Sequence, residues 1–400
     1  MSISLEVHPV SPWRVTLAGF CASLVGIGFA RFAYTPLLPA LVSAHWFAAS
    51  SAAYLGAANL AGYLAGAVAA RPLARAVGPR AAINGMMLLA SLALAACAWP
   101  LSFAWFFVWR FASGLAGGVL MVLAATAVLH HIPPHRRGLA SGVIFMGVGA
   151  GIAASGTVVP LLIRQGLAAT WLGLGGLSLA LTAMTWRSWP HGAAQAASLA
   201  DGAPDAAGQS TALRALYVEY ALNAVGLVPH MLFLVDFVAR GLHQGVQVGS
   251  GYWVLFGLGA LIGPVLAGHL ADRIGFGRAL RLAFLVEAAA VALPALGQGA
   301  SALMLSSVVV GAFTPGIVPL ALGRIHELLP HRPAQQRAAW SRATTSFAVL
   351  QATAAYGMSY LFGRDGSYTL LFTLGSLALV AALAVDAARG WRYRTKGIAQ

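Results

Sequence analysis

The sequence predicts an all-α membrane protein of about twelve transmembrane helices, arranged as two six-helix repeats with both termini in the cytoplasm. Composition is the first reason. The chain is 59% hydrophobic and 8% charged, with a mean hydropathy of +0.79, far outside the range of soluble globular chains. Apolar runs long enough to cross a bilayer, roughly 17 to 25 residues, also recur along the whole chain. In addition, arginines gather in alternate breaks between these runs, and parts of the first half recur in the second.

Short breaks containing arginine, proline or glycine separate the apolar runs. The predicted membrane helices cover residues 14–40, 50–70, 81–99, 102–129, 138–163, 167–186, 213–239, 250–268, 279–297, 300–326, 338–362 and 367–388. The first run lacks a following cleavage site and soluble domain, so we expect a retained helix and not a signal peptide. Cys21 and Cys97 lie inside apolar runs and predict neither a disulfide framework nor a metal site.

The net charge of +14 reflects membrane topology. Counted from a cytoplasmic N-terminus, the inward-facing breaks contain Arg71, Arg75, Arg80, Arg136, Arg137, Arg187, Arg214, Arg273, Arg278, Arg281, Arg332, Arg337, Arg342, Arg389, Arg392, Arg394 and Lys396. The outward-facing breaks contain Arg164, Arg240 and Arg364. The positive-inside rule therefore places both termini in the cytoplasm and favours an even number of spans. We expect no nucleic acid as a partner.

One extended polar stretch, residues 188–212, is predicted to be a cytoplasmic linker between an N-terminal half, residues 1–187, and a C-terminal half, residues 213–400. The halves repeat each other, because Pro134-His135-Arg136 recurs 196 positions later as Pro330-His331-Arg332. Parallel six-helix repeats are a known design of secondary transporters, in which the substrate binds between the halves near the middle of the bilayer.

A motif after the eighth run resembles the signature that major facilitator superfamily transporters carry between helices two and three and between helices eight and nine. It reads Gly268-His-Leu-Ala-Asp272-Arg273-Ile-Gly275-Phe-Gly-Arg278. We expect Gly268 to permit close helix approach and Asp272 to cap or pair with a neighbouring helix end. The two arginines would lie at the cytoplasmic headgroups. The first-half copy has Arg75 at the acidic position, so we expect the second-half loop to carry the gating role.

Other segments extend this resemblance over the whole chain. They are Arg110-Phe-Ala-Ser-Gly114-Leu-Ala-Gly117-Gly118, similar to an intramembrane arginine-and-glycine motif, and Gly28-Phe-Ala-Arg31-Phe-Ala-Tyr34-Thr35-Pro36-Leu-Leu-Pro39, which resembles the opening of the YbfB-type branch. The resemblance implies a multi-pass secondary transporter of the bacterial inner membrane that works by alternating access. Gly147, Gly151 and Gly156 resemble a glycine-rich exporter helix and slightly favour export, although packed membrane helices use the same spacing.

Ionisable groups inside the bilayer are expected to mark the functional site, because they are costly to bury unless paired or hydrated. Arg31 shares a helix face with Tyr34 and Thr35 at i+3 and i+4, so the three residues can line a cavity. The alternative is an arginine that ties the first helix to its neighbours. Both readings also apply to Arg110. If both arginines point inward, the cavity suits an anionic or carbonyl-rich small organic solute.

On the seventh run, Glu219, Asn223, Gly226 and His230 form a narrow polar stripe. Carboxylates and imidazoles can be tuned to accept and release protons, so the stripe predicts proton coupling. The alternatives are an interfacial role for Glu219 and a simple interhelical hydrogen bond for His230.

We assign the remaining intramembrane polar and helix-breaking residues with less specific signals. Asp236 and Arg240 predict an ion pair at the outer surface, and Glu287 a structural or lipid-shielded group. Further solute contacts are expected from Asn59, Tyr63, Trp253 and Gln351, although membrane aromatics more often pack or anchor. Candidate hinges are Pro229 and the segment Pro315, Gly316 and Pro319.

An enzyme is the rival class, and the sequence argues against it. The one lysine, Lys396, is in the tail, which excludes a P-loop and Schiff-base chemistry. The segment from His326 to His331 has the wrong spacing for a zinc pair and contains Pro330, so we expect a loop there. We expect no cofactor and no metal. The partners are then protons, lipids and a small solute, and a transporter-like sensor, receptor or lipid transporter stays an open alternative.

Overall fold

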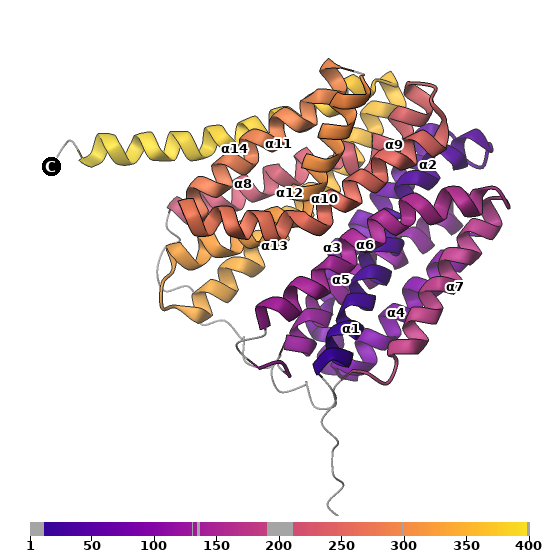
Figure 1. Ribbon diagram of the computed structural model, residues 1–400, viewed down its shortest axis with the longest axis horizontal. Coiled ribbons are helices and arrows are strands. Elements are labelled where there is room, and N and C mark those ends of the chain that lie inside the picture. The colour runs from indigo at the N-terminus through magenta and orange to yellow at the C-terminus, as the bar shows by residue number, and fades with distance from the viewer. Residues whose placement is uncertain (1–11, 130, 134–136, 190–210, 298, 398–400) are drawn as a thin grey trace, which may run out of the picture.

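The computed structural model describes residues 12–129, 131–133, 137–189, 211–297 and 299–397. Within these ranges the regular elements are helices, which form two bundles (Figure 1). The predicted linker lies almost entirely outside the described residues. So do Pro134-His135-Arg136 and the side chains of the basic tail from residue 389 onward. The division of the chain at residues 188–212 therefore stays a prediction.

The N-terminal bundle begins with a span of three consecutive segments. These are α1 (Pro12–Ser23), the π-helix η1 (Leu24–Phe32) and α2 (Tyr34–Ser43). The further described helices of this bundle are α3 (Ala49–Val77), α4 (Pro79–Ala96), α5 (Phe103–Leu129), α6 (Arg137–Ile163) and α7 (Leu167–Thr185). Helices α5 and α6 both pack against η1, so the segment that holds Arg31 is fixed by neighbours from its own half.

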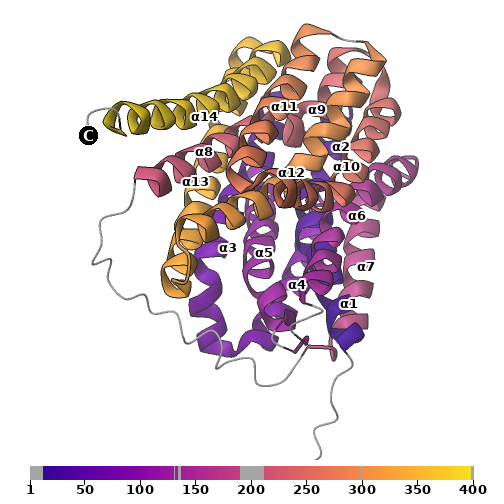
Figure 2. The same cartoon turned by 60° about the vertical axis from the view of Figure 1, so that its left-hand side comes forward.

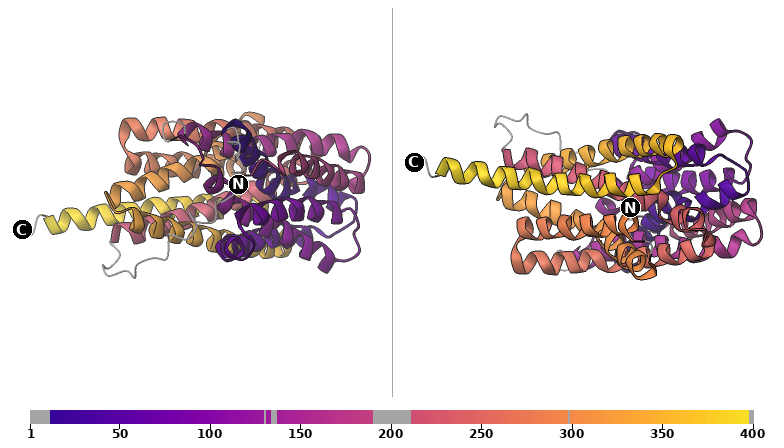
Figure 3. Two further views of the ribbon diagram at one scale, coloured as in Figure 1. Left: turned by 90° about the horizontal axis from the view of Figure 1, so that it is seen from below. Right: turned by 90° about the horizontal axis from the view of Figure 1, so that it is seen from above.

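The C-terminal bundle begins with a span that also changes helix type. Its segments are α8 (Thr211–Val228), the π-helix η5 (Pro229–Phe233), α9 (Leu234–Asp236) and the π-helix η6 (Phe237–Gly241). Pro229 is the first residue of η5, where its missing N–H disfavours a regular α-helix. The bundle continues with α10 (Gly245–Ile274), α11 (Phe276–Leu296), α12 (Ala300–Leu328), α13 (Pro333–Asp365) and α14 (Tyr368–Gly397). Helix α14 projects beyond the others (Figure 3).

The helices agree with the predicted twelve spans. Among the described residues, eleven spans are long and apolar enough to cross a membrane. The first is α1 with η1 and α2, and the seventh is α8 with η5, α9 and η6. Helix α13 is the more polar twelfth, and it packs against α3 of one half and α8 of the other. The structure therefore confirms an all-α protein of twelve long spans.

Close glycine contacts reveal the repeat in three dimensions. Glycines in corresponding helix pairs, 197 positions apart in each case, meet backbone of the facing helix: Gly62 and Gly259, Gly66 and Gly263, Gly114 and Gly311. The first member of each pair packs α3 against α5, and the second packs α10 against α12. Gly78 and Gly275, also 197 positions apart, both have positive φ, 85° and 81°, a region that glycine adopts at little cost. Equivalent helix pairs in the two halves thus pack through glycines at equivalent positions.

Two expectations about local structure are wrong. No atom lies within 4 Å of a Cβ built on Gly268, so this glycine does not permit a close helix approach. Helix α12 continues through Pro315 and Pro319, and the role of this segment as a hinge stays a prediction. The helix ends at Leu328, which makes His326 and Glu327 helical and not part of a loop.

The two bundles meet through α6 with α10, α3 with α13, and α2 with α9 (Figure 2). We call the end of the bundle at Gly78 and Gly275 the arginine-rich end, and the opposite end, at Gly366, the arginine-poor end. Near the arginine-poor end the Tyr54 and Tyr356 rings are 6.2 Å apart and Gly363 faces Ser50, and α6 also meets α10 farther along, where Gly149 faces Leu261. The first two contacts join the bundles at the arginine-poor end in this conformation.

Candidate functional site

Arg31 lies at the junction of the two halves. Its Nη2 donates a hydrogen bond to Gln351 Oε1 on α13, at 2.7 Å. The guanidinium also lies 5.1 Å from the ring centroid of Tyr63 and 5.2 Å from that of Phe32, within the range of cation–π attraction. Its Nε has no hydrogen-bond partner among the described residues. Arg31 therefore joins the halves and still has a donor available for a ligand.

The π-helix η5 contributes the opposite wall of this junction. Thr35 Oγ1 donates to the backbone carbonyl of Met231 at 2.5 Å. The Met231 sulfur lies 3.7 Å from Arg31 Nη2 and 3.6 Å from Gln351 Nε2. Arg31, Thr35, Tyr63, Met231 and Gln351 form what we call the junction cluster. It brings together residues of the first, second, seventh and eleventh spans.

Arg110 and Asn59 form a separate cluster behind the junction. Arg110 Nη1 donates to the carbonyl of Ala30 at 2.9 Å, and Asn59 Nδ2 lies 3.2 Å from the same carbonyl and 2.8 Å from Ser113 Oγ. The Arg110 guanidinium also lies 4.3 Å from the ring centroid of Tyr34. Both donors thus hold the backbone of η1 one residue before Arg31. Arg110 thus has the structural role that the sequence left as the alternative, and it is not part of the junction cluster that contains Arg31.

Trp253 packs at the interface of the halves. Its Nε1 donates to Ser155 Oγ on α6 at 3.1 Å, and its ring stacks on Phe256 with a centroid distance of 4.7 Å. The same ring lies 5.9 Å from Phe32, which neighbours Arg31. Trp253 is fully buried, so in this conformation it acts as packing between α10, α6 and η1.

The predicted stripe on the seventh span divides between different partners. Asn223 Nδ2 donates to Glu287 Oε2 on α11 at 2.7 Å. His230 Nε2 lies 2.7 Å from Ser306 Oγ on α12, and Ser306 Oγ donates to the carbonyl of Ala290 at 2.7 Å. A serine hydroxyl has a single proton, so His230 Nε2 must donate to Ser306. This polar system lies inside the C-terminal half, apart from the junction cluster.

Two carboxylates have more specific surroundings than the sequence suggests. Asp236 forms the ion pair with Arg240 that the sequence predicts, and its side chain is fully buried. It accepts hydrogen bonds from the Tyr368 hydroxyl at 2.6 Å and from Arg240 at 3.1 Å. Glu287 is also fully buried and is held by Asn223, so it is not shielded by lipid alone. Sequence reasoning missed Tyr368, Ser306 and Met231, because hydroxyls and thioethers in apolar helices carry no signal of their distant partners.

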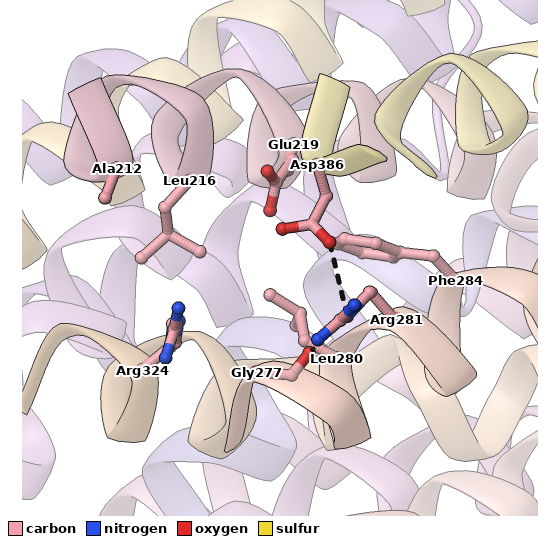
Figure 4. Close-up of a pocket in the computed structure, with 9 residues that line it drawn as sticks. All are labelled: Ala212, Leu216, Glu219, Gly277, Leu280, Arg281, Phe284, Arg324 and Asp386. Atoms are coloured by element: carbon pink, nitrogen blue, oxygen red, sulfur yellow. Dashed lines mark hydrogen bonds and ion pairs between the residues drawn. The ribbon is translucent and has the colours of Figure 1, made fainter. Parts of the chain in front are cut away.

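Glu219 lines a small pocket at the arginine-rich end of the C-terminal bundle. The pocket is bounded by Ala212, Leu216, Glu219, Gly277, Leu280, Arg281, Phe284, Arg324 and Asp386 (Figure 4). Arg281 Nε forms an ion pair with Asp386 at 3.2 Å. The Glu219 and Asp386 carboxylates both point into this pocket in Figure 4. No cluster of three or more metal-ligating side chains occurs among the described residues.

The loop of the superfamily signature is organised by a residue outside the motif. Asp272, Arg273 and Arg278 are exposed, and Gly275 ends α10 with a positive φ. Glu327 on α12 accepts the N–H of Phe276 at 3.0 Å and a hydrogen bond from Arg324 at 2.7 Å. Glu327 thus caps the start of α11, the role that we expected for Asp272. Arg75, at the end of α3, is also exposed.

The glycines of the fifth predicted helix have clear packing partners. Gly151 faces Gly28 of η1, and Gly147 faces Phe20 of α1. Gly156 faces Ser250 and Val254 of α10 in the other half. Packing alone accounts for these glycines, so they do not require a role in export.

Comparisons with known proteins agree with this architecture. A family model described as an uncharacterised MFS-type transporter, YbfB, matches residues 23–387. The xylose transporter XylE from E. coli, in a partially occluded inward-open conformation, superposes with a TM-score of 0.73 at 14% identity, covering 93% of this chain and 98% of XylE. A D-xylose–proton symporter gives 0.71 at 15% identity, covering 93% and 97%. Inward-open XylE gives 0.72 at 16% identity, covering 94% and 95%. No curated protein sequence matches the chain.

Proposed function

Because the chain belongs to the YbfB-type family of major facilitator superfamily transporters, we propose that it couples the movement of a small organic solute to protons and that the junction cluster binds the solute. The family and the fold together make it a multi-pass secondary transporter that works by alternating access. Its particular solute, its coupling ion and its membrane, for which we propose the bacterial inner membrane, belong to the proposal.

The contact between Arg31 and Gln351 is the observation that carries the solute site. It joins the first span of one half to the eleventh span of the other. A group bound between these two side chains therefore contacts both halves. An alternating-access cycle must weaken the contacts between the halves on one side and form them on the other. A solute that replaces Gln351 as the partner of Arg31 would bind at the point where the halves separate.

The chemistry of the cluster favours a carboxylate or a carbonyl-rich solute. A guanidinium offers planar pairs of N–H donors that match carboxylate oxygens. The amide of Gln351 and the hydroxyl of Tyr63 can donate or accept, while Phe32 and Tyr63 provide apolar faces. Arg31 has no acidic partner within hydrogen-bond or ion-pair distance among the described residues. An anionic group on the solute would therefore neutralise an arginine that otherwise has only neutral neighbours.

The position of the interbundle contacts supports a conformation closed at the arginine-poor end. Tyr54 with Tyr356 and Ser50 with Gly363 meet there. By the positive-inside rule we place the arginine-rich end, and with it both chain termini, in the cytoplasm. The chain would then be closed to the outside. The motif around Gly275 and its cap Glu327 would control opening on the cytoplasmic side.

The direction of transport stays a prediction. The glycine series slightly favours export by sequence resemblance, but its members are explained by packing. Two buried ionisable groups of the C-terminal half, Glu287 and His230, support proton coupling.

The first test is thermal stabilisation of the purified protein by a library of organic acids, amino acids, sugars and cationic compounds at two pH values. A ligand that binds only the folded state raises the melting temperature by mass action. We expect anionic compounds to stabilise the wild type, and expect Arg31→Ala to remove this effect. The matched control is Arg364→Ala, which alters an exposed arginine paired with Asp365.

Hits are then assayed for flux in proteoliposomes with and without a proton gradient. Proton-dependent accumulation or efflux of an anionic hit supports the proposal. Stabilisation that is unchanged in Arg31→Ala would overturn the assignment of the solute site. Binding without flux in either direction would instead favour a transporter-like sensor.

A further inference from the structure

We propose that Glu287 and Asn223 form a proton-binding site inside the C-terminal half, loaded from the pocket that contains Glu219 and separate from the junction cluster. This inference rests on the proposed function, because it supplies the site of proton coupling. Three observations support this inference. Glu287 is buried, its hydrogen-bond partner is a single amide, and a pocket reaches the face of α8 that contains Asn223.

The surroundings of Glu287 favour a neutral carboxyl. Glu287 lies on α11, and its side chain is fully buried. Asn223 Nδ2 donates to Oε2 at 2.7 Å, and Oε1 has no hydrogen-bond partner among the described residues. An ionised carboxylate at membrane depth is stable where cations or several donors surround it. A single neutral amide does not meet that requirement, so a bound proton completes the site in this conformation.

Asn223 suits both protonation states of Glu287. Its amide can donate N–H to the carboxylate, and after rotation its oxygen can accept the O–H of the carboxylic acid. The Asn223 Oδ1 has no hydrogen-bond partner among the described residues, so the carbonyl side of the amide is unengaged. An amide of this kind can hold the carboxyl in place while the proton arrives and leaves.

A short route connects this site to the arginine-rich end. Glu219 precedes Asn223 by four residues on α8, so the two lie on one face with an axial separation of about 6 Å. Glu219 lines the pocket that also contains Asp386 and Arg281 (Figure 4). Polar side chains around a pocket can hold water, and water with Glu219 can pass a proton over the remaining turn to Glu287.

Charged and titratable groups lie on two sides of Glu287. Toward the pocket they are Glu219 on α8, Arg281 on α11, Arg324 on α12 and Asp386 on α14. On the other side is His230 of η5, which is joined through Ser306 to the carbonyl of Ala290, three residues after Glu287. Helix α14 contributes the Ser376 hydroxyl, which donates to the carbonyl of Ala288 at 2.9 Å. Among these described contacts, none places a cation within ion-pair distance of Glu287.

The location of the site gives it a means to affect transport. Asn223 and His230 are on the same span as Met231, whose carbonyl and sulfur contact Thr35, Arg31 and Gln351 in the junction cluster. A change in charge at Glu287 would alter the contact of α8 with α11. That change can reach the junction along the same span, because η5 directly follows α8 and includes Met231.

The test is infrared difference spectroscopy of the purified protein in lipid nanodiscs as the pH is changed. We expect a C=O band from a buried protonated carboxyl that disappears as the pH rises, and we expect Glu287→Gln to lack it. Glu219→Gln and Asp386→Asn should keep the band, because they alter only the pocket. Asn223→Ala should shift the pH at which the band disappears. Asp365→Asn, at an exposed carboxylate, is the matched surface control.

A second measurement avoids dependence on the folding of any variant. A hydrophobic carbodiimide adds to protonated carboxyls within the bilayer, and the carboxyl proton moves to a carbodiimide nitrogen as the new O–C bond forms. Peptide mass spectrometry of wild-type protein should locate the adduct on Glu287 at low pH and find less of it at high pH. Identical infrared bands in wild type and Glu287→Gln, or labelling that spares Glu287, would overturn the inference.

Flux measurements separate this inference from the proposed function. If Glu287→Gln transports the solute with unchanged dependence on the proton gradient, the proton site is refuted and the transport proposal stands. If Glu287 carries a titrating proton but no solute is ever moved, the proton site stands and the transport proposal fails.

Discussion

Substitution of Gly263 by alanine tests the packing that defines each half. The added Cβ would collide with the carbonyl group and Cα of Ala312 on α12. These are backbone atoms, so no side-chain rotation can relieve the contact and α10 must move away from α12. Overpacking of this kind typically costs about 1–3 kcal/mol. We therefore expect Gly263→Ala to lower stability by an amount in this range.

A matched substitution in the same helix should act in the opposite direction. No atom lies within 4 Å of a Cβ built on Gly251, and alanine in a helix interior is favoured over glycine by about 0.5–1 kcal/mol. Thermal unfolding of both variants, monitored by loss of the monodisperse gel-filtration peak, compares the two signs. A Gly263→Ala protein as stable as Gly251→Ala would refute the close packing of α10 and α12.

Three further predictions concern single contacts. Tyr368→Phe removes the hydroxyl that donates to Asp236 and should destabilise the protein by about 1.5–3 kcal/mol, the usual worth of a hydrogen bond to a charged group; an unchanged melting temperature would contradict this. Arg31→Ala should weaken binding of an anionic solute roughly tenfold to hundredfold, as expected for one charge-assisted contact, while equal titration curves for both proteins would argue against the site. Glu327→Ala should slow transport and lower stability by about 1 kcal/mol through loss of the α11 cap, whereas Asp272→Asn should leave stability unchanged; the reverse order would restore the capping role to Asp272.

The Arg110 cluster shows that a recognisable motif can position another residue without contacting the solute itself. Arg110 and Asn59 bind the carbonyl of Ala30, and the glycines around Arg110 bring α5 close to α3 and η1. The cluster therefore fixes the backbone from which Arg31 projects. Its substitution is expected to disturb the junction through this backbone, and its effect on solute binding would be indirect.

The sequence alone determined the membrane class, the twelve spans and the repeat. These features depend on local composition and on spacing along the chain. A long run of apolar residues favours a membrane-spanning helix whatever its neighbours are. Glycines recur after 197 positions because equivalent helices pack alike. Of the three residues that the sequence places on one helix face, Arg31 and Thr35 lie in the junction cluster, whereas Tyr34 packs against Arg110 in the separate cluster.

Only the tertiary structure decided which polar residues share an environment. Arg31 and Gln351 are 320 positions apart, and nothing in either helix indicates the other. Arg110, a similar arginine by sequence, instead donates a hydrogen bond to the backbone of η1. Glu287, a single carboxylate in an apolar run, accepts a hydrogen bond from Asn223. The physical reason is that helical periodicity fixes which residues share a face, whereas the packing of whole helices fixes what that face meets.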